Sequence, residues 1–98
     1  MTPRLLLQPG AQADLAEAFQ WYEQRAVGLG HEYLRVVRLT LAAIEKSPDQ
    51  YPLVLDDIRR AGIRRFPCFI FYVARSSGAT VISVIHGRRD PRRWQARS

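Results

Sequence analysis

Residues 58–86 decide the fold, and they read IRRAGIRRFPCFIFYVARSSGATVISVIH. Residues 69–74 and 80–86 are dense in β-branched and aromatic side chains, which is typical of strands, and residues 76–78 between them are typical of a turn. Residues 58–66 are also strand-like, although they are rich in arginine. The pattern predicts three successive antiparallel strands.

The two later strands are apolar at nearly every position. A strand with one buried face alternates between apolar and polar side chains, so this pattern indicates cover on both faces of the sheet. Helices of the same chain can cover one face. We expect something else to cover the second face, and a partner chain is a candidate.

Residues upstream of these strands indicate a short strand and two helices. Residues 4–8 are strand-like, and Pro9-Gly10 is expected to end that strand. Apolar residues then recur at helical spacing on both sides of the break at Gly28-Leu29-Gly30. The second helix should end before Ser47-Pro48, and so short a link predicts an antiparallel helical hairpin.

The predicted element order is β-α-α-β-β-β-α. Asp90 and Pro91 resemble the cap and first position of a terminal helix. The order predicts an α+β fold with a helical hairpin packed on a small, mainly antiparallel sheet, and residues 1–98 suit a single domain. We expect the core to contain Leu15, Phe19, Tyr22, Val37, Leu41, Ile44, Phe71, Ile82 and Val84.

The charge of the chain is unevenly distributed. Residues 1–58 hold five basic and eight acidic side chains, a net charge of −3. Residues 59–98 hold ten arginines and one acid, a net charge of +9, so the whole chain carries +6. This field favours an anionic partner, such as nucleic acid, the ribosome or an acidic protein.

Several classes of protein and site are excluded or disfavoured. Cys68 is the only cysteine, so there is no internal disulfide, and with two histidines the chain has too few soft ligands for a structural zinc site. We expect no metal and no cofactor. The apolar run at residues 5–7 is too short for a signal peptide or a membrane span, so we expect a cytoplasmic protein with no membrane partner.

Arginines of the first predicted strand are candidates for binding. Strand alternation places Arg60 and Arg64 on one face, with Phe66 after them, and Arg59 and Arg65 on the other, unless a bulge near Gly62 changes the phase. Arginine binds phosphates through two hydrogen bonds and stacks on bases, which favours a binding surface. The alternative is an edge strand that charge protects against aggregation.

His86 and the residues after it are the other candidates. A histidine at the end of a strand can act as a general acid or base near neutral pH, or it can be structural. Trp94 can anchor the terminal helix or stack on a base. Carboxylates in the helices are interpreted as solvated surface charge. The arginines that extend the basic patch are Arg88, Arg89, Arg92 and Arg93.

Two motifs make the chain resemble the RelE/ParE superfamily of toxins from type II toxin–antitoxin systems. The first is RRFP-x-FIFY at residues 64–72, and the second is HGRRDP-x-x-W at residues 86–94. The segments Trp21-Tyr22-Glu23 and Gly28-Leu29-Gly30 agree, so the resemblance covers nearly the whole chain. It implies the fold, a growth-inhibiting role and a cognate antitoxin that wraps the toxin.

The branches of this superfamily act on different targets. RelE-like members are ribosome-dependent ribonucleases that cut mRNA, whereas ParE-like members poison DNA gyrase. In the ribonuclease branch, Arg60, Arg64 and Arg88 would stand at the basic positions, with His86 as a substitute acid–base group.

Two departures from the ribonuclease pattern favour the ParE-like branch. The position of the ribonuclease tyrosine holds Trp94, which has no hydroxyl, and the strand lysines are replaced by arginines, which are poor proton donors. For a ParE-like toxin, the target-binding residues would be Arg60, Arg64, Arg88, Arg89, Arg92, Arg93 and Trp94. A non-toxic nucleic-acid-binding or regulatory module with the same fold is a third possibility.

Overall fold

The structure is a computed structural model, and it describes residues 5–86. The five strands form one sheet in the order β1-β5-β4-β3-β2, in which β1 pairs parallel with β5 and the other pairs are antiparallel. This arrangement confirms the predicted α+β fold as far as residue 86, and the helix expected around residues 90–97 lies outside the described residues. The elements are β1 (Leu5–Leu7), α1 (Pro9–Arg25), α2 (Leu29–Lys46), the 3-10 helix η1 (Pro48–Gln50), β2 (Leu53–Leu55), β3 (Ile58–Gly62), β4 (Cys68–Arg75) and β5 (Gly78–His86).

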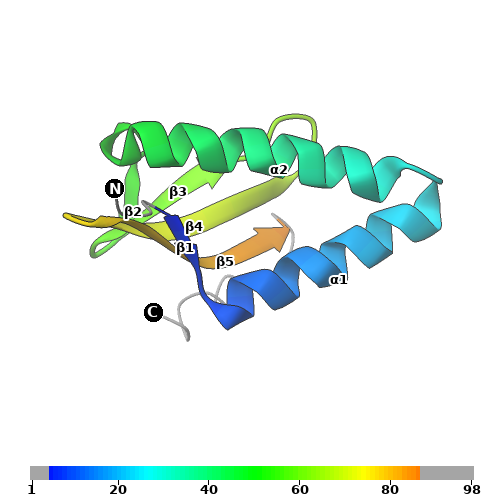
Figure 1. The fold of residues 1–98 in the computed structure, drawn as a ribbon, viewed down its shortest axis with the longest axis horizontal. Coiled ribbons are helices and arrows are strands. Elements are labelled where there is room, and N and C mark those ends of the chain that lie inside the picture. The colour runs from blue at the N-terminus through cyan, green and yellow to red at the C-terminus, as the bar shows by residue number, and fades with distance from the viewer. Residues whose placement is uncertain (1–4, 87–98) are drawn as a thin grey trace.

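Helices α1 and α2 form the predicted antiparallel hairpin, and they converge at the turn between them (Figure 1). The turn is held by Glu23, whose carboxylate accepts hydrogen bonds from the N–H groups of Gly28 (2.8 Å) and Gly30 (2.9 Å). The bond from Gly28 is the main cause that lowers the pKa of Glu23 below its ordinary value. Gly28 has a φ of 89°, a conformation that glycine adopts without strain.

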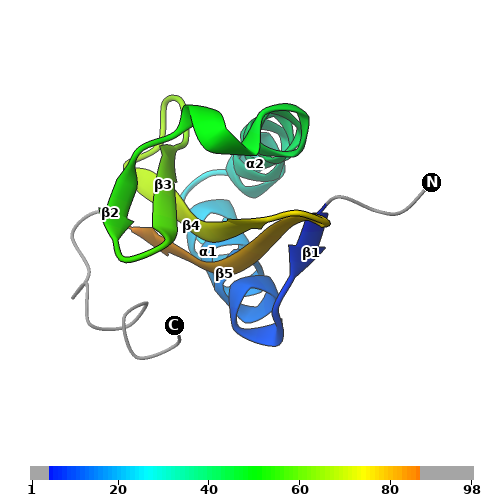
Figure 2. The same ribbon diagram turned by 90° about the vertical axis from the view of Figure 1, so that its left-hand side faces the viewer.

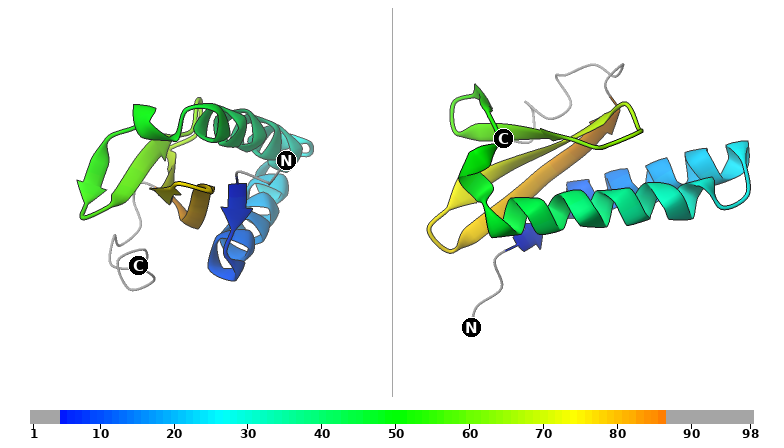
Figure 3. Two further views of the ribbon diagram at one scale, coloured as in Figure 1. Left: turned by 60° about the vertical axis from the view of Figure 1, so that its left-hand side comes forward. Right: turned by 90° about the horizontal axis from the view of Figure 1, so that it is seen from above.

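Both faces of the sheet carry buried apolar side chains, as the sequence predicted. The helices pack on one face, and the core there includes Tyr22, Tyr33 and Ile44 from the helices and Ile70 and Tyr72 from β4. Among residues 5–86, the second cluster consists of strand residues, and it is called the strand-only cluster below: Ile58, Phe71, Val73, Ile82 and Ile85, with Phe69 packed against them. Figures 2 and 3 show that the sheet is strongly twisted, as expected for strands of L-residues.

A β-bulge in β5 changes which residues face the helices. The pairing steps from Phe71 opposite Ser83 to Tyr72 opposite Val81, so Ile82 is an extra residue in the ladder. Before the bulge, odd-numbered Val81 belongs to the helix-side core, whereas after it even-numbered Val84 does. The extra residue therefore reverses the alternation of the last part of β5, including His86.

The short first strand ends before Pro9, as predicted. Pro9 also stands in the first turn of α1, where its missing N–H has no helical partner to lose. Two details of the predicted sheet are wrong. The strand β2 was not expected. Because β2 pairs outside β3, the arginine-bearing β3 is an inner strand, which contradicts the interpretation of its arginines as protection of an edge.

The predicted core is largely confirmed. Tyr22, Val37, Ile44, Phe71, Ile82 and Val84 are buried, whereas Leu15, Phe19 and Leu41 are only partly buried. Asp14 was placed on the solvated side of its helix, but it is buried. Within residues 5–86, no helix is long and apolar enough to cross a membrane.

Replacing Gly30 by alanine should destabilise the hairpin. A Cβ atom at Gly30 would lie 2.7 Å from the carbonyl oxygen of Phe19 and 2.8 Å from its ring, so the helices would have to separate. Overpacking of this kind costs about 1–3 kcal/mol, although glycine to alanine in a helix is otherwise favourable. Urea unfolding of the Gly30→Ala variant measures the change.

Gly62→Ala is the matched control for this substitution. Its added Cβ would approach nothing closer than the ring of Phe69 at 3.7 Å, an ordinary contact. We expect its free energy of unfolding to be equal to or above that of the wild type. A Gly30→Ala variant as stable as the wild type would contradict the close packing of the hairpin.

Candidate functional site

The four arginines at residues 59–65 occupy different environments. Arg59, on β3, donates hydrogen bonds to the carbonyl oxygens of Tyr51 (2.6 Å) and Asp49 (3.2 Å), so it holds the chain before β2. Arg60 is exposed, and its guanidinium lies 4.6 Å from the ring centroid of Phe69. Arg59 and Arg60 therefore face opposite sides of the sheet, as alternation predicted.

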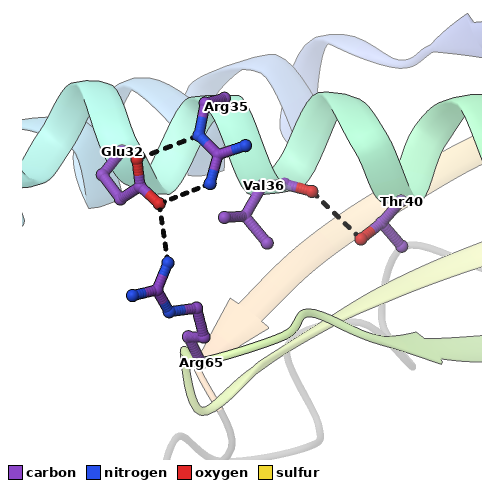
Figure 4. Close-up of polar contacts among 5 residues, drawn as sticks. All are labelled: Glu32, Arg35, Val36, Thr40 and Arg65. Carbon is purple, nitrogen blue, oxygen red and sulfur yellow. Dashed lines mark hydrogen bonds and ion pairs between the residues drawn. The ribbon is translucent and has the colours of Figure 1, made fainter.

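Arg64 and Arg65 are not part of the strand, because β3 ends at Gly62 and both lie in the turn before β4. Arg65 has a φ of 72° and donates a hydrogen bond to Glu32 on α2 (3.1 Å), which also binds Arg35 (2.7 Å; Figure 4). The bond from Arg35 is the main cause that lowers the pKa of Glu32. The expected alternation of Arg60, Arg64 and Phe66 on one strand face is therefore wrong.

Among residues 5–86, Arg60 and Arg64 form no ion pair with an acidic side chain, whereas Arg59 and Arg65 do. Both residues are exposed. An arginine that is not neutralised by its own protein can offer its donors to an external anion. Within residues 5–86, Arg60 and Arg64 are therefore the arginines of this segment that remain available for binding a target.

His86 lies on the helix side of the sheet, opposite Cys68 in the ladder. Its ring packs at 6.4 Å from the ring of Trp21 on α1, in an edge-to-face arrangement. Arg60 contacts Phe69, which belongs to the strand-only cluster on the other face. His86 and Arg60 therefore lie on opposite faces of the sheet.

A cavity of about 210 Å³ lies beside His86, between α1 and the end of β5. Its inner wall includes Tyr22, Tyr33 and Cys68, and the Tyr22 hydroxyl lies 3.7 Å from the Cys68 sulfur. Asp14 also lines it, and the Asp14 carboxylate accepts a hydrogen bond from the Val84 N–H (3.0 Å). The carboxylate joins α1 to β5 and is not free surface charge.

This cavity was not predicted from the sequence. The sequence signal for the cavity is the helical spacing of Asp14, Ala18 and Tyr22. This spacing places the Asp14 carboxylate on the same helix face as two residues that face the core. Within residues 5–86, there is no cluster of three or more histidine, cysteine or carboxylate side chains that would hold a metal ion. The predicted site residues Arg88, Arg89, Arg92, Arg93 and Trp94 lie outside the described residues.

Comparison with known families agrees with this fold and with the motifs. Residues 5–91 match the model of a family described as "ParE toxin of type II toxin-antitoxin system, parDE". The chain belongs to the ParE toxin family. It is therefore a ParE-type toxin of a type II toxin–antitoxin system, which confirms the superfamily and its ParE branch.

Individual relatives support the same assignment. Toxin ParE2 of Mycobacterium tuberculosis, from strains CDC 1551 / Oshkosh and ATCC 25618 / H37Rv, is 26% identical over 97 residues, covering 98% of this toxin and 92% of the relative. A chain of the chromosomal ParDE system from P. aeruginosa superposes with a TM-score of 0.73 at 14% identity, covering 85% of the toxin and 94% of that chain. The isolated E. coli RelE toxin gives a TM-score of 0.56 at 15% identity, covering 95% and 93%. At these identities the two structures support the fold alone.

The buried tyrosines of the toxin should make its stability depend on alkaline pH. Burial raises the pKa of Tyr72 to about 12, and burial also raises the pKa values of Tyr22 and Tyr33. An unfolded tyrosine ionises near a pKa of about 10, so the folded state holds these protons more tightly. The resulting stabilisation is complete below pH ~10 and is lost as the pH rises towards and through about 12.

Urea unfolding at a series of alkaline pH values, with tyrosinate absorbance as a second signal, measures this dependence. Tyr72→Phe is the informative variant, because it removes one titrating group together with the hydrogen bond from Tyr72 to the Pro48 carbonyl oxygen. It should show a shallower loss of stability above pH ~10. Tyrosines that ionise near pH ~10 while the protein remains folded would be incompatible with the described burial.

Proposed function

We propose that this toxin stops growth by binding DNA gyrase, as a single domain of residues 1–98 that acts in the cytoplasm without catalysing a reaction. The observation that carries this proposal is the position of His86 and Arg60 on opposite faces of the sheet. The relatives named ParE and the matching family favour the same branch.

Cleavage of mRNA needs acid–base groups close to the cations that hold the phosphate. A proton must leave the attacking 2′-hydroxyl, another must reach the leaving oxygen, and cations must lie at the phosphate between them. His86 packs against Trp21, away from Arg60, and Arg64 belongs to a turn. Burial raises the pKa values of Tyr22 and Tyr33 further from neutrality, which makes them poor acid–base groups at physiological pH.

Binding to a protein target makes no such demand. Arg60 and Arg64, exposed and not paired with acids among residues 5–86, would contact the target together with Arg88 and Arg89. Arg92, Arg93 and Trp94 would extend that surface. Most of the +9 charge of residues 59–98 belongs to these positions, and it would direct the toxin towards an acidic or DNA-bound surface.

Membership of the family implies a cognate antitoxin as partner. We propose that it is an acidic, partly disordered segment that covers the arginines and apolar surface of the sheet. Such a segment would gain from charge neutralisation and from buried area at once, at the cost of its own ordering.

Two substitutions separate binding from catalysis in cells. If the toxin acts by binding, His86→Ala should retain growth arrest within about threefold, because no proton transfer is lost. If His86 were an acid–base group, the same change should reduce mRNA cleavage by about 10²–10⁴-fold. Growth after induction, together with primer extension on cellular mRNA, gives the answer.

The charge-reversal variant Arg88→Glu should abolish growth arrest, because it places a carboxylate where the target offers negative charge. Arg38→Glu is its control, since Arg38 is exposed on α2 and belongs to no candidate surface. Loss of toxicity in Arg38→Glu but not in Arg88→Glu would be contrary to the proposed binding surface. If His86→Ala abolished both growth arrest and codon-specific mRNA cuts, the toxin would act as a RelE-like ribonuclease, and the proposal of binding without catalysis would be wrong.

A further inference from the structure

The cavity between α1 and β5 has the properties of a docking pocket for one side chain. Its volume is about 210 Å³, and aromatic and aliphatic side chains dominate its lining, among them Tyr22, Tyr33 and Val84. An apolar protein cavity of about 150 Å³ can hold a benzene molecule. The space therefore suits one aromatic or leucine side chain rather than a larger ligand.

Trp21 stands at the rim of this pocket, and Arg25 lies directly beside Trp21. Trp21 lines the pocket and is 43% exposed, so part of its ring can contact a partner. The guanidinium of Arg25 lies 3.8 Å from the centroid of the Trp21 ring system. Tryptophan and arginine are enriched among the interface residues that lose most affinity when they are truncated.

The rim is also held in place before any partner arrives. The Trp21 ring packs edge-to-face on Tyr22 at 5.0 Å and against His86 at 6.4 Å, while Arg25 covers one of its faces. Tyr22 in turn packs on Tyr33 and Phe66, which belong to the core. Side chains that are already ordered lose little conformational entropy on binding, so contacts with this rim contribute more to the binding free energy.

We propose that this pocket receives an apolar anchor side chain of the antitoxin, and that an acidic residue beside the anchor pairs with Arg25. This proposal rests on the proposed function only in that the partner is the antitoxin. The bound side chain should have an acidic neighbour, because Arg25 places a positive charge at the rim of the pocket. The net charge of +6 on the toxin also attracts an acidic partner. Nucleic acid fits less well, because the lining of the pocket is mostly apolar.

The target is expected to bind elsewhere. Arg60 contacts the strand-only cluster on the opposite face of the sheet, whereas Trp21 and the pocket belong to the helix side. A variant that fills the pocket should therefore separate the two activities. It should escape the antitoxin and still arrest growth.

Ala18→Phe tests the pocket, because Ala18 lines it and an added ring would occupy its space. Ala16→Phe is the matched control, since Ala16 lies on the same helix, is exposed and does not line the pocket. The probe is the purified antitoxin encoded by the reading frame next to the toxin gene. Isothermal titration should show affinity weakened at least about tenfold for Ala18→Phe and unchanged within about threefold for Ala16→Phe.

Trp21→Ala gives a second, independent variant should Ala18→Phe fail to fold. It removes the exposed ring at the rim, and Leu39→Ala, at an exposed position on α2, controls for the loss of apolar surface. We expect Trp21→Ala to weaken antitoxin binding at least about tenfold and to keep growth arrest, while Leu39→Ala changes neither.

The binding measurements test the docking pocket, and the growth measurements test the proposed toxic function, so either proposal can fail without the other. Folded Ala18→Phe and Trp21→Ala variants that bind the antitoxin as the wild type does would overturn the docking pocket. Loss of toxicity with antitoxin binding intact would overturn it as well, by assigning the pocket to the target. Failure of the wild type to arrest growth would instead contradict the proposed function, while the titrations would still decide the pocket.

Discussion

The extra residue in β5 decides how the surfaces of this toxin are distributed. Without the bulge at Ile82, strand alternation would place His86 on the same face as Arg60, beside the strand-only cluster. With it, His86 turns to the helix side and packs against Trp21. Val84 also joins the helix-side core, and its N–H, two residues beyond the bulge, donates to Asp14 on α1.

The helical hairpin packs on the sheet face to which the bulge turns Val84. Tyr22 and Tyr33 pack on each other at 5.0 Å, and both contact Phe66 from the turn before β4. These rings join the two helices to the sheet, and the cavity remains between them and the end of β5. The helix side thus offers an apolar docking pocket, whereas the exposed Arg60 belongs to the other face.

Sequence patterns predicted the hairpin, four of the five described strands and most of the core, because those elements carry clear periodicity or dense β-forming residues. They did not predict the face of His86, since residues 80–86 are apolar at nearly every position and contain no alternation from which a bulge could be inferred. They missed β2 because Leu53–Leu55 is apolar at all three positions and shows no alternation that would separate it from a loop. Asp14 was misplaced because a charged side chain was assumed to be solvated, although its helical spacing matched that of Tyr22.

The toxin is proposed to act by binding gyrase, with no acid–base step. The most direct measurement titrates the purified full chain into a gyrase supercoiling reaction, with a translating extract as the parallel sample. A binding toxin inhibits supercoiling at toxin concentrations that leave the translated mRNA intact. Unimpaired supercoiling, together with mRNA cut at the decoded codon, would contradict the claim.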